Sequence, residues 1–96
     1  MSGQEQIEQA FGVVVKHYRK ARGWNQNDLA EKAGVHLATV VRAESGSGTV
    51  SAATLSTYGA AFGVLAEDIM AAVAREARLQ RVASDARKQA EQGVNK

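Results

Sequence analysis

The 96-residue sequence predicts an all-α fold of five helices with a C-terminal helical extension. Three observations lead to this prediction. Apolar residues recur at the three- and four-residue spacing of a helical stripe in several segments. Glycines and capping residues separate these segments, as is typical of helix ends. The sequence has no proline, and no alternating β-branched run predicts a strand.

The first helix is predicted to run from about Gly3 to Gly23. Ser2 and Glu5 have the spacing of a capping box, in which side chains satisfy the free amides at the start of a helix. Glycine at position 23 ends the helix in this prediction. The side chains expected to be buried share one face and are Ile7, Ala10, Phe11, Val14 and Tyr18.

Residues 26–45 are predicted to form two short helices joined by a tight turn. Gly34 can adopt the left-handed conformation that ends a helix and turns the chain sharply. Val35 then anchors the turn, and Val40 and Ala43 place the second helix against the first. The apolar residues of the pair are Leu29, Ala30, Ala33, Val35, Val40 and Ala43. This pattern is typical of a helix-turn-helix.

The residues before this pair predict how its first helix begins. Asn25 is a favourable N-cap, because its side chain can accept from the free amide of Asn27 or Asp28. Trp24 and Leu29 have the spacing of a hydrophobic staple, which closes the start of a helix with an apolar contact. We therefore expect the single tryptophan to pack within the protein rather than to stack on a ligand.

The next segment predicts a fourth helix and a short fifth helix. Ser51 is a favourable N-cap for the fourth helix, and Gly63 ends it. Its inward side chains are predicted to be Leu55, Tyr58 and Phe62. The fifth helix begins near Leu65 or Ala66 and includes Ile69, so we expect a domain over residues 1–69.

Residues 70–96 are predicted to form a helical tail that is regular to about Glu91. Positions 69, 72, 76, 79, 83, 86 and 90 have heptad-like spacing, but most of them are alanine and one is Glu76. Such a seam buries little apolar area. Two interpretations therefore stand: a solvated helix with charge pairs such as Asp85 with Lys88, or an arm for dimerisation or for contact with a polyanion.

Composition excludes several classes of function. The sequence has no cysteine, so it contains neither a disulfide nor a thiolate metal site. The only histidines, His17 and His36, have no acidic residue three or four positions away, and no glycine loop with a phosphate-binding lysine is present. No secretion signal or membrane-spanning segment is apparent. We expect a cytoplasmic protein that is not an enzyme and has no cofactor, metal or membrane partner.

The residues from Phe11 to Ile69 resemble the DNA-binding domain of phage-repressor and Cro-type transcriptional regulators. The resemblance implies a lambda-repressor-like fold, in which residues 37–45 form the recognition helix. The matching positions are Gly12, Arg19 to Gly23, Gln26, Leu29, Ala30, Gly34, Val35, Thr39, Val40, Arg42, Glu44, Gly46, Leu55, Tyr58, Phe62, Gly63, Val64, Asp68 and Ile69.

The resemblance and the geometry of groove docking place five residues at the bases of DNA. They are His36, Leu37, Ala38 and Thr39 at the start of the recognition helix, and Arg42 one turn later. Arg42 is the candidate for a bidentate contact with guanine. Leu37 and Ala38 depart from the polar residues common in the family, and they suit thymine methyl groups or a protein partner.

Other residues are expected to contact phosphates. Gln26, assisted by Asn27, lies at the start of a helix, where free amides suit an anion. Ser45 and Ser47 lie in a loop predicted to be flexible, residues 45–49, on the other side of the recognition helix. These contacts position a protein on DNA without specifying the sequence.

The resemblance also implies an ion pair between Arg19 and Glu44, with a structural role. If the pair is partly buried, loss of one partner costs up to about 3–5 kcal/mol. A surface pair is worth only about 0–1 kcal/mol.

Charge is distributed unevenly along the chain. Residues 1–69 contain six Lys/Arg and seven Asp/Glu, whereas residues 70–96 contain six and three. The net charge of +2 therefore comes from the tail. Within the domain, the basic residues cluster at the end of the first helix, and they are Lys16, Arg19, Lys20 and Arg22. Such a cluster favours nucleic acid.

The main hypothesis is a sequence-specific regulator that binds double-stranded DNA as a homodimer and acts as a repressor. One alternative is a protein-interaction module that uses Leu37, Ala38 and the tail. Another is an antitoxin that binds a cognate toxin and represses its own operon. Steep salt dependence of binding would distinguish DNA from an apolar protein contact.

Overall fold

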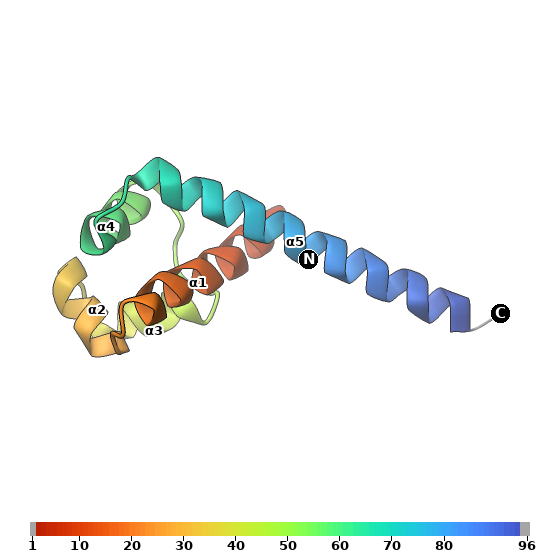
Figure 1. Ribbon diagram of the computed structural model, residues 1–96, viewed down its shortest axis with the longest axis horizontal. Helices are drawn as coiled ribbons and strands as arrows, with labels where there is room; N and C mark the ends of the chain where they lie inside the picture. The colour runs from red at the N-terminus through yellow and green to blue at the C-terminus, as the bar shows by residue number, and fades with distance from the viewer. Residues whose placement is uncertain (1, 95–96) are drawn as a thin grey trace.

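The computed structural model describes residues 2–94, which form five α-helices and no strand (Figure 1). The helices are α1 (Gly3–Ala21), α2 (Gln26–Ala33), α3 (Leu37–Glu44), α4 (Ala52–Phe62) and α5 (Ala66–Val94). The predicted all-α fold of five helices is confirmed, and so is the lambda-repressor-like arrangement of a helix-turn-helix within it.

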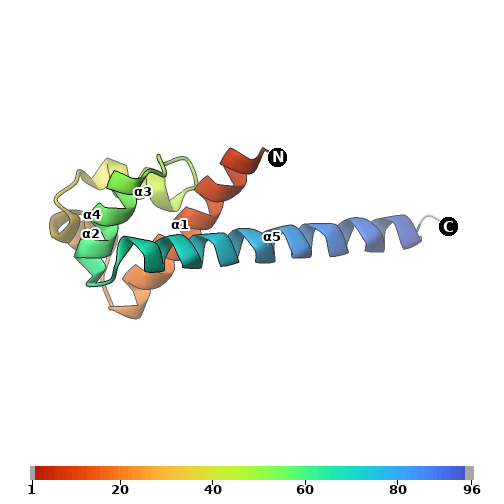
Figure 2. The same cartoon turned by 90° about the horizontal axis from the view of Figure 1, so that it is seen from above.

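The four shorter helices and the first part of α5 surround one core, and the rest of α5 projects away from it (Figure 2). α5 packs against α1 and α4, while α3 packs against α1 and α2. The largest fully buried side chains are Tyr58, Phe11, Leu29, Ile69, Val15, Val40 and Val73. Every helix contributes to this core, so the position of α3 is fixed by contacts with both of its neighbours.

The predicted helix starts are confirmed by the caps. Ser2 accepts from the amide of Glu5 at the start of α1. Asn25 Oδ1 accepts from the amide of Asp28, and Asp28 Oδ2 accepts from the amide of Asn25, so α2 begins with a reciprocal capping box. Ser51 Oγ accepts from the amide of Thr54 at the start of α4.

The helix ends differ slightly from the prediction. α1 ends at Ala21 with Arg22 as its C-cap, and Gly23 follows with a φ of 71°. α2 ends at Ala33, and its C-cap is the predicted Gly34, whose φ of 67° lies in the left-handed region that favours glycine. α3 ends at Glu44, one residue before the predicted limit, with Ser45 as its cap.

Gly12 allows α1 and α3 to approach each other closely. A Cβ atom at this position would lie 2.6 Å from the carbonyl oxygen of Ala43 and 3.0 Å from that of Glu44. These atoms belong to the backbone of α3, so they cannot move away without displacing the helix. The absence of a side chain at Gly12 therefore sets the distance between α1 and the C-terminal end of α3.

Trp24 packs within the protein, as the sequence predicted, and it does so in an aromatic cluster that the sequence did not predict. Its ring lies 6.0 Å from that of Phe62 in a stacked arrangement, and Tyr18 stacks on Phe62 at 5.1 Å. Leu29, its predicted staple partner, is fully buried. The cluster joins the end of α1 to the end of α4.

α5 is one continuous helix, and the predicted boundary at residue 69 falls inside it. Its buried residues are Ile69, Val73 and Ala77, which repeat every four positions. The heptad-like positions 79, 83, 86 and 90 are exposed. Across residues 2–94 no single helix meets the length and apolarity needed to cross a membrane, although α4 and α5 together do, with a bend of 107° between them.

Candidate nucleic-acid interface

One face of α3 packs in the core and the opposite face is open to solvent. Val40 and Ala43 are buried and anchor the helix. The exposed residues of α3 and its cap are His36, Leu37, Ala38, Val41 and Arg42, and Thr39 is half-buried. The side chains predicted to meet DNA bases therefore lie together on one accessible surface. Val41, which is 44% exposed, adds an apolar group that the sequence prediction did not include.

Gln26 and Asn27 lie at the start of α2, next to the C-terminal end of α3. Gln26 Nε2 donates a hydrogen bond to Glu44 Oε1 over 3.2 Å. This bond leaves the amide oxygen of Gln26 and its second N–H without a partner among residues 2–94. Asn27 is exposed. Glu44 of α3 therefore holds the side chain of Gln26, the residue predicted to contact a phosphate, in one orientation.

The ion pair between Arg19 and Glu44 is bidentate and almost completely buried. Arg19 Nε donates to Glu44 Oε2 at 2.6 Å, and Nη2 donates to Oε1 at 2.9 Å. The side chains are 9% and 3% exposed. Arg19 Nη1 also donates to the carbonyl of Trp24 at 2.7 Å. The hydrogen bonding of Arg19 to the carboxylate of Glu44 raises the pKa of Arg19, against the effect of burial. The pair joins α1 to α3.

The basic cluster at the end of α1 is smaller than the sequence predicted. Arg22 donates to the carbonyls of Tyr18 and Phe62, and its guanidinium lies over the ring of Phe62 at 5.2 Å. Arg19 is buried with Glu44. Only Lys16 and Lys20 of the cluster are exposed. The planar, multidentate guanidinium groups bind protein carbonyls and a carboxylate here, so they are not available to DNA phosphates.

The loop after α3, predicted to be flexible, is tied to the end of that helix. The hydroxyls of Ser45 and Ser47 both donate to the carbonyl of Arg42, at 2.9 and 3.3 Å, and lie 3.1 Å from each other. Gly48 packs directly on α3, since a Cβ atom there would lie 2.8 Å from the Cα of Ala43. Both serines remain exposed, so their hydroxyls still reach solvent.

A polar pocket of about 330 Å³ lies between α3, this loop and α4. It is lined by Thr39, Arg42, Ala43, Ser47, Gly48, Thr49, Thr54 and Tyr58. The Tyr58 hydroxyl is buried and has no hydrogen-bond partner among the described residues. Burial raises the pKa of Tyr58, and the negative charge of Glu44 raises it further. Hydroxyls and one guanidinium therefore surround a space that opens beside the recognition face.

No cluster of His, Asp or Glu within residues 2–94 has the arrangement of a metal site. What the described residues do present is an exposed helix, held by a tight turn against a second helix, with hydrogen-bonding groups on both sides. Such an arrangement defines the class of helix-turn-helix proteins that bind DNA and regulate transcription.

Comparisons with known proteins agree with this class. A family model described as helix-turn-helix matches residues 15–69, which is more than half of the chain, so the protein belongs to this helix-turn-helix family. The predicted membership is thereby confirmed. No curated protein matches the sequence.

A solved structure shares the fold. It is the crystal structure of the clp gene regulator ClgR from Corynebacterium glutamicum, with a TM-score of 0.82 and 24% sequence identity. The match covers 91% of this chain and 93% of that chain. It therefore includes most of α5 as well as the helix-turn-helix.

Proposed function

We propose that this protein is a transcriptional repressor that reads the major groove of double-stranded DNA with α3. The observation that carries the proposal is the open face of α3, where His36, Leu37, Ala38 and Arg42 are all exposed. A helix fits the major groove, and the N-terminal residues of a recognition helix meet the base edges there. Repression needs only that a protein occupies a promoter, and in this proposal DNA binding through this face is sufficient for that.

Arg42 is the residue proposed to contact guanine. Its guanidinium makes no hydrogen bond or ion pair with residues 2–94, so its planar fork is free for the O6 and N7 atoms. Leu37 and Ala38 contact thymine methyl groups in this proposal, and Val41 extends the same apolar strip. His36 and Thr39 donate hydrogen bonds to base or phosphate oxygens.

Phosphate contacts flank α3 on both sides. Gln26 and Asn27 bind one phosphate at the start of α2, where the positive end of the helix adds attraction. In this proposal Ser45 and Ser47 bind another on the opposite side, next to the polar pocket, once their hydroxyls turn from the carbonyl of Arg42 to the phosphate. Because Arg19 and Arg22 are engaged internally, the affinity depends on these few neutral groups together with Arg42, Lys16 and Lys20.

The protein binds as a homodimer to two half-sites about one helical turn apart. A single module of this size buries little DNA surface, and pairing doubles the contact area. In this proposal the protein acts in the cytoplasm, without a cofactor and without enzymatic activity.

Selection of bound duplexes from random DNA, followed by a salt titration, tests this function. We expect one enriched motif with twofold symmetry, an affinity that falls steeply with salt, and reduced transcription from a promoter that carries the motif. Enrichment of no motif, together with no duplex retained at low salt, would contradict this function.

One observation favours a second candidate, a protein-interaction module. Leu37 and Val41 are 43% and 44% exposed and lie one turn apart on α3. Apolar pairs of this kind also suit a helix-binding partner. Binding through this strip would not weaken with salt, so the same titration separates the two candidates.

A further inference from the structure

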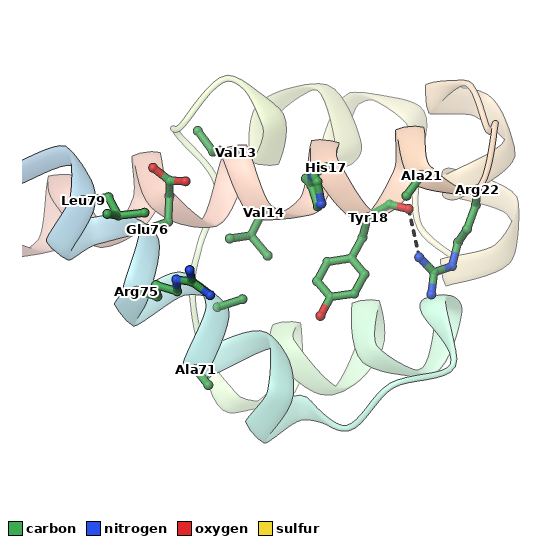
Figure 3. Close-up of a pocket in the computed structure, with 11 residues that line it drawn as sticks. Val13, Val14, His17, Tyr18, Ala21, Arg22, Ala71, Arg75, Glu76 and Leu79 are labelled. Carbon is green, nitrogen blue, oxygen red and sulfur yellow. Dashed lines mark hydrogen bonds between the residues drawn. The ribbon is translucent and has the colours of Figure 1, made fainter. Parts of the chain in front are cut away.

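The polar pocket between α3, the loop after it and α4 differs in chemistry from the groove between α1 and α5. The walls of that groove include the apolar side chains of Val14, Ala72 and Leu79 (Figure 3). The polar pocket is lined by one guanidinium, that of Arg42, and by the hydroxyl side chains of Thr39, Ser47, Thr49, Thr54 and Tyr58. None of its lining residues, all of which lie within 2–94, is acidic. The lining therefore offers hydrogen-bond donors and positive charge.

Tyr58 places a buried donor at this pocket. The residue is 1% exposed, and its ring packs edge to face against Phe11 and stacks on Phe62 in the core. The hydroxyl is the only polar atom of the side chain, and it has no hydrogen-bond partner among the described residues. Native proteins leave few buried polar atoms without a partner. A group that enters the pocket and accepts from this hydroxyl would supply one.

Positive charge borders the pocket on two sides. Arg42 is exposed, and its guanidinium makes no hydrogen bond or ion pair with residues 2–94. Thr54 lies in the first turn of α4, where the helix dipole is positive. The carboxylate of Glu44 acts on Tyr58, but its charge is offset by the bidentate pair with Arg19. The pocket therefore favours an anion.

The donors of the pocket lie on three segments of the chain. Those on α3 are Thr39 and Arg42, those in the loop are Ser47 and Thr49, and the buried one on α4 is Tyr58. A phosphate group presents three strong acceptor oxygens, whereas a carboxylate presents two in one plane. Donors on three segments suit the phosphate. The volume of about 330 Å³ lies at the lower end of the range for ligand pockets, about 300–1,000 Å³, so a small organic group fits beside the phosphate.

We propose that this pocket binds a small organic phosphate, whose oxygens accept from the hydroxyls of Tyr58 and Thr49 and from the guanidinium of Arg42. The ligand is free in solution, because a phosphate within a duplex is held at the protein surface by its neighbours in the strand and does not reach the buried hydroxyl. Arg42 cannot bind a ligand and a guanine at once, so the ligand competes with DNA. This competition rests on the proposed function, whereas the binding of the phosphate does not.

NMR titrations without DNA and at constant ionic strength test the site, with the amides of residues 47–49 and of Thr54 as reporters. The probes are inorganic phosphate, glycerol 3-phosphate and acetate. We expect saturable shifts, with glycerol 3-phosphate bound most tightly and acetate most weakly. No saturable shift, or acetate bound at least as tightly as phosphate, would overturn the proposal. Glycerol 3-phosphate bound no more tightly than inorganic phosphate would indicate an adventitious ion only, and it would overturn the proposal too.

Matched variants test which hydroxyls bind the phosphate. Tyr58→Phe is expected to raise the dissociation constant of glycerol 3-phosphate at least tenfold, because it removes the buried donor and keeps the ring. Tyr18→Phe is its control, since Tyr18 lines the groove between α1 and α5 instead (Figure 3). Thr49→Val should also weaken binding, and Thr57→Val is its control, because the Thr57 hydroxyl donates to the carbonyl of Ala53. Equal effects of a variant and its control would exclude the site.

Competition is measured on the selected duplex at constant ionic strength, which removes the general effect of salt. Glycerol 3-phosphate should weaken duplex binding by the wild type but not by Tyr58→Phe, and the two proteins should bind the duplex equally without it. Equal weakening of both would overturn the competition.

Two further outcomes separate this proposal from the proposed function. If Tyr58→Phe weakens binding to every duplex and no free phosphate binds, the pocket holds a phosphate of DNA and the proposal is wrong. If glycerol 3-phosphate binds in a manner that depends on Tyr58 while no duplex binds, the pocket is supported and the DNA-binding function is removed.

Discussion

Gln26 Nε2 donates a hydrogen bond to Glu44 Oε1, the same oxygen that accepts from Arg19 Nη2. One carboxylate therefore connects three helices: α1 through Arg19, α2 through Gln26 and α3 through its own backbone. The buried pair thus orients a residue proposed to bind phosphate, and it fixes the end of the proposed recognition helix.

Arg19→Met is expected to destabilise the fold strongly. It leaves the carboxylate of Glu44 buried without its cation, which costs about 3–5 kcal/mol in comparable buried pairs. Urea unfolding measures the change in free energy. Arg19→Met combined with Glu44→Leu should recover part of this loss, because no charge is then left uncompensated. A single-variant loss below about 1 kcal/mol would contradict burial and place the pair among surface ion pairs.

Gly12→Ala is expected to destabilise the protein and to tilt α3. The added methyl group meets the carbonyl oxygens of Ala43 and Glu44, and overpacking of this kind costs about 1–3 kcal/mol. Gly3→Ala is the control, since no atom lies within 4 Å of a Cβ there. Thermal unfolding of both variants checks the prediction. A Gly12→Ala variant as stable as Gly3→Ala would show that the two helices can separate at little cost.

Local sequence patterns predicted most of the fold. Asn25, Gly34, Ser51 and Gly63 determine helix ends through contacts within a few residues of the chain, so spacing alone was sufficient to place them. The buried Arg19–Glu44 pair spans 25 positions, and only the resemblance to a family indicated it.

Contacts between distant segments account for what the sequence did not predict. The sequence places Arg22 in a basic cluster, but its guanidinium donates to the carbonyl of Phe62, 40 positions away. The seam of α5 was assigned from heptad spacing, whereas Val73 and Ala77 pack on the body of the domain. The four-residue repeat of Ile69, Val73 and Ala77 competes with the heptad-like spacing, and contacts with α1 decide which of these two faces is buried.

Tyr58→Phe is expected to stabilise the protein at neutral pH. The substitution removes a buried hydroxyl that has no partner among the described residues, and an unsatisfied group of this kind costs about 1–3 kcal/mol. The ring and its edge contact with Phe11 are retained. Urea unfolding should therefore show a higher midpoint. A lower midpoint would indicate that water satisfies the hydroxyl in the polar pocket.

The same variant is expected to change stability at alkaline pH. The pKa of Tyr58 is raised in the folded state, so the folded protein holds its proton more tightly than the unfolded chain. The stabilisation that comes from this tighter proton binding is fully present below about pH 10, the pKa of tyrosine in the unfolded chain. It is lost as the pH rises through the higher pKa of Tyr58 in the folded protein. The free energy of unfolding, measured from pH 8 to 11, should decline less with pH for Tyr58→Phe than for the wild type.

Arg42→Ala and Gln26→Ala are expected to impair DNA binding in different ways. Loss of a bidentate guanine contact should cost about 1–3 kcal/mol and relax the preference at one base position. Loss of the phosphate contact at Gln26 should weaken binding to all sequences by a similar factor. Affinities for the selected site, for its single-base variants and for random duplex measure both effects. Equal losses on selected and random DNA for Arg42→Ala would exclude base reading by this residue, because a phosphate contact alone gives that result.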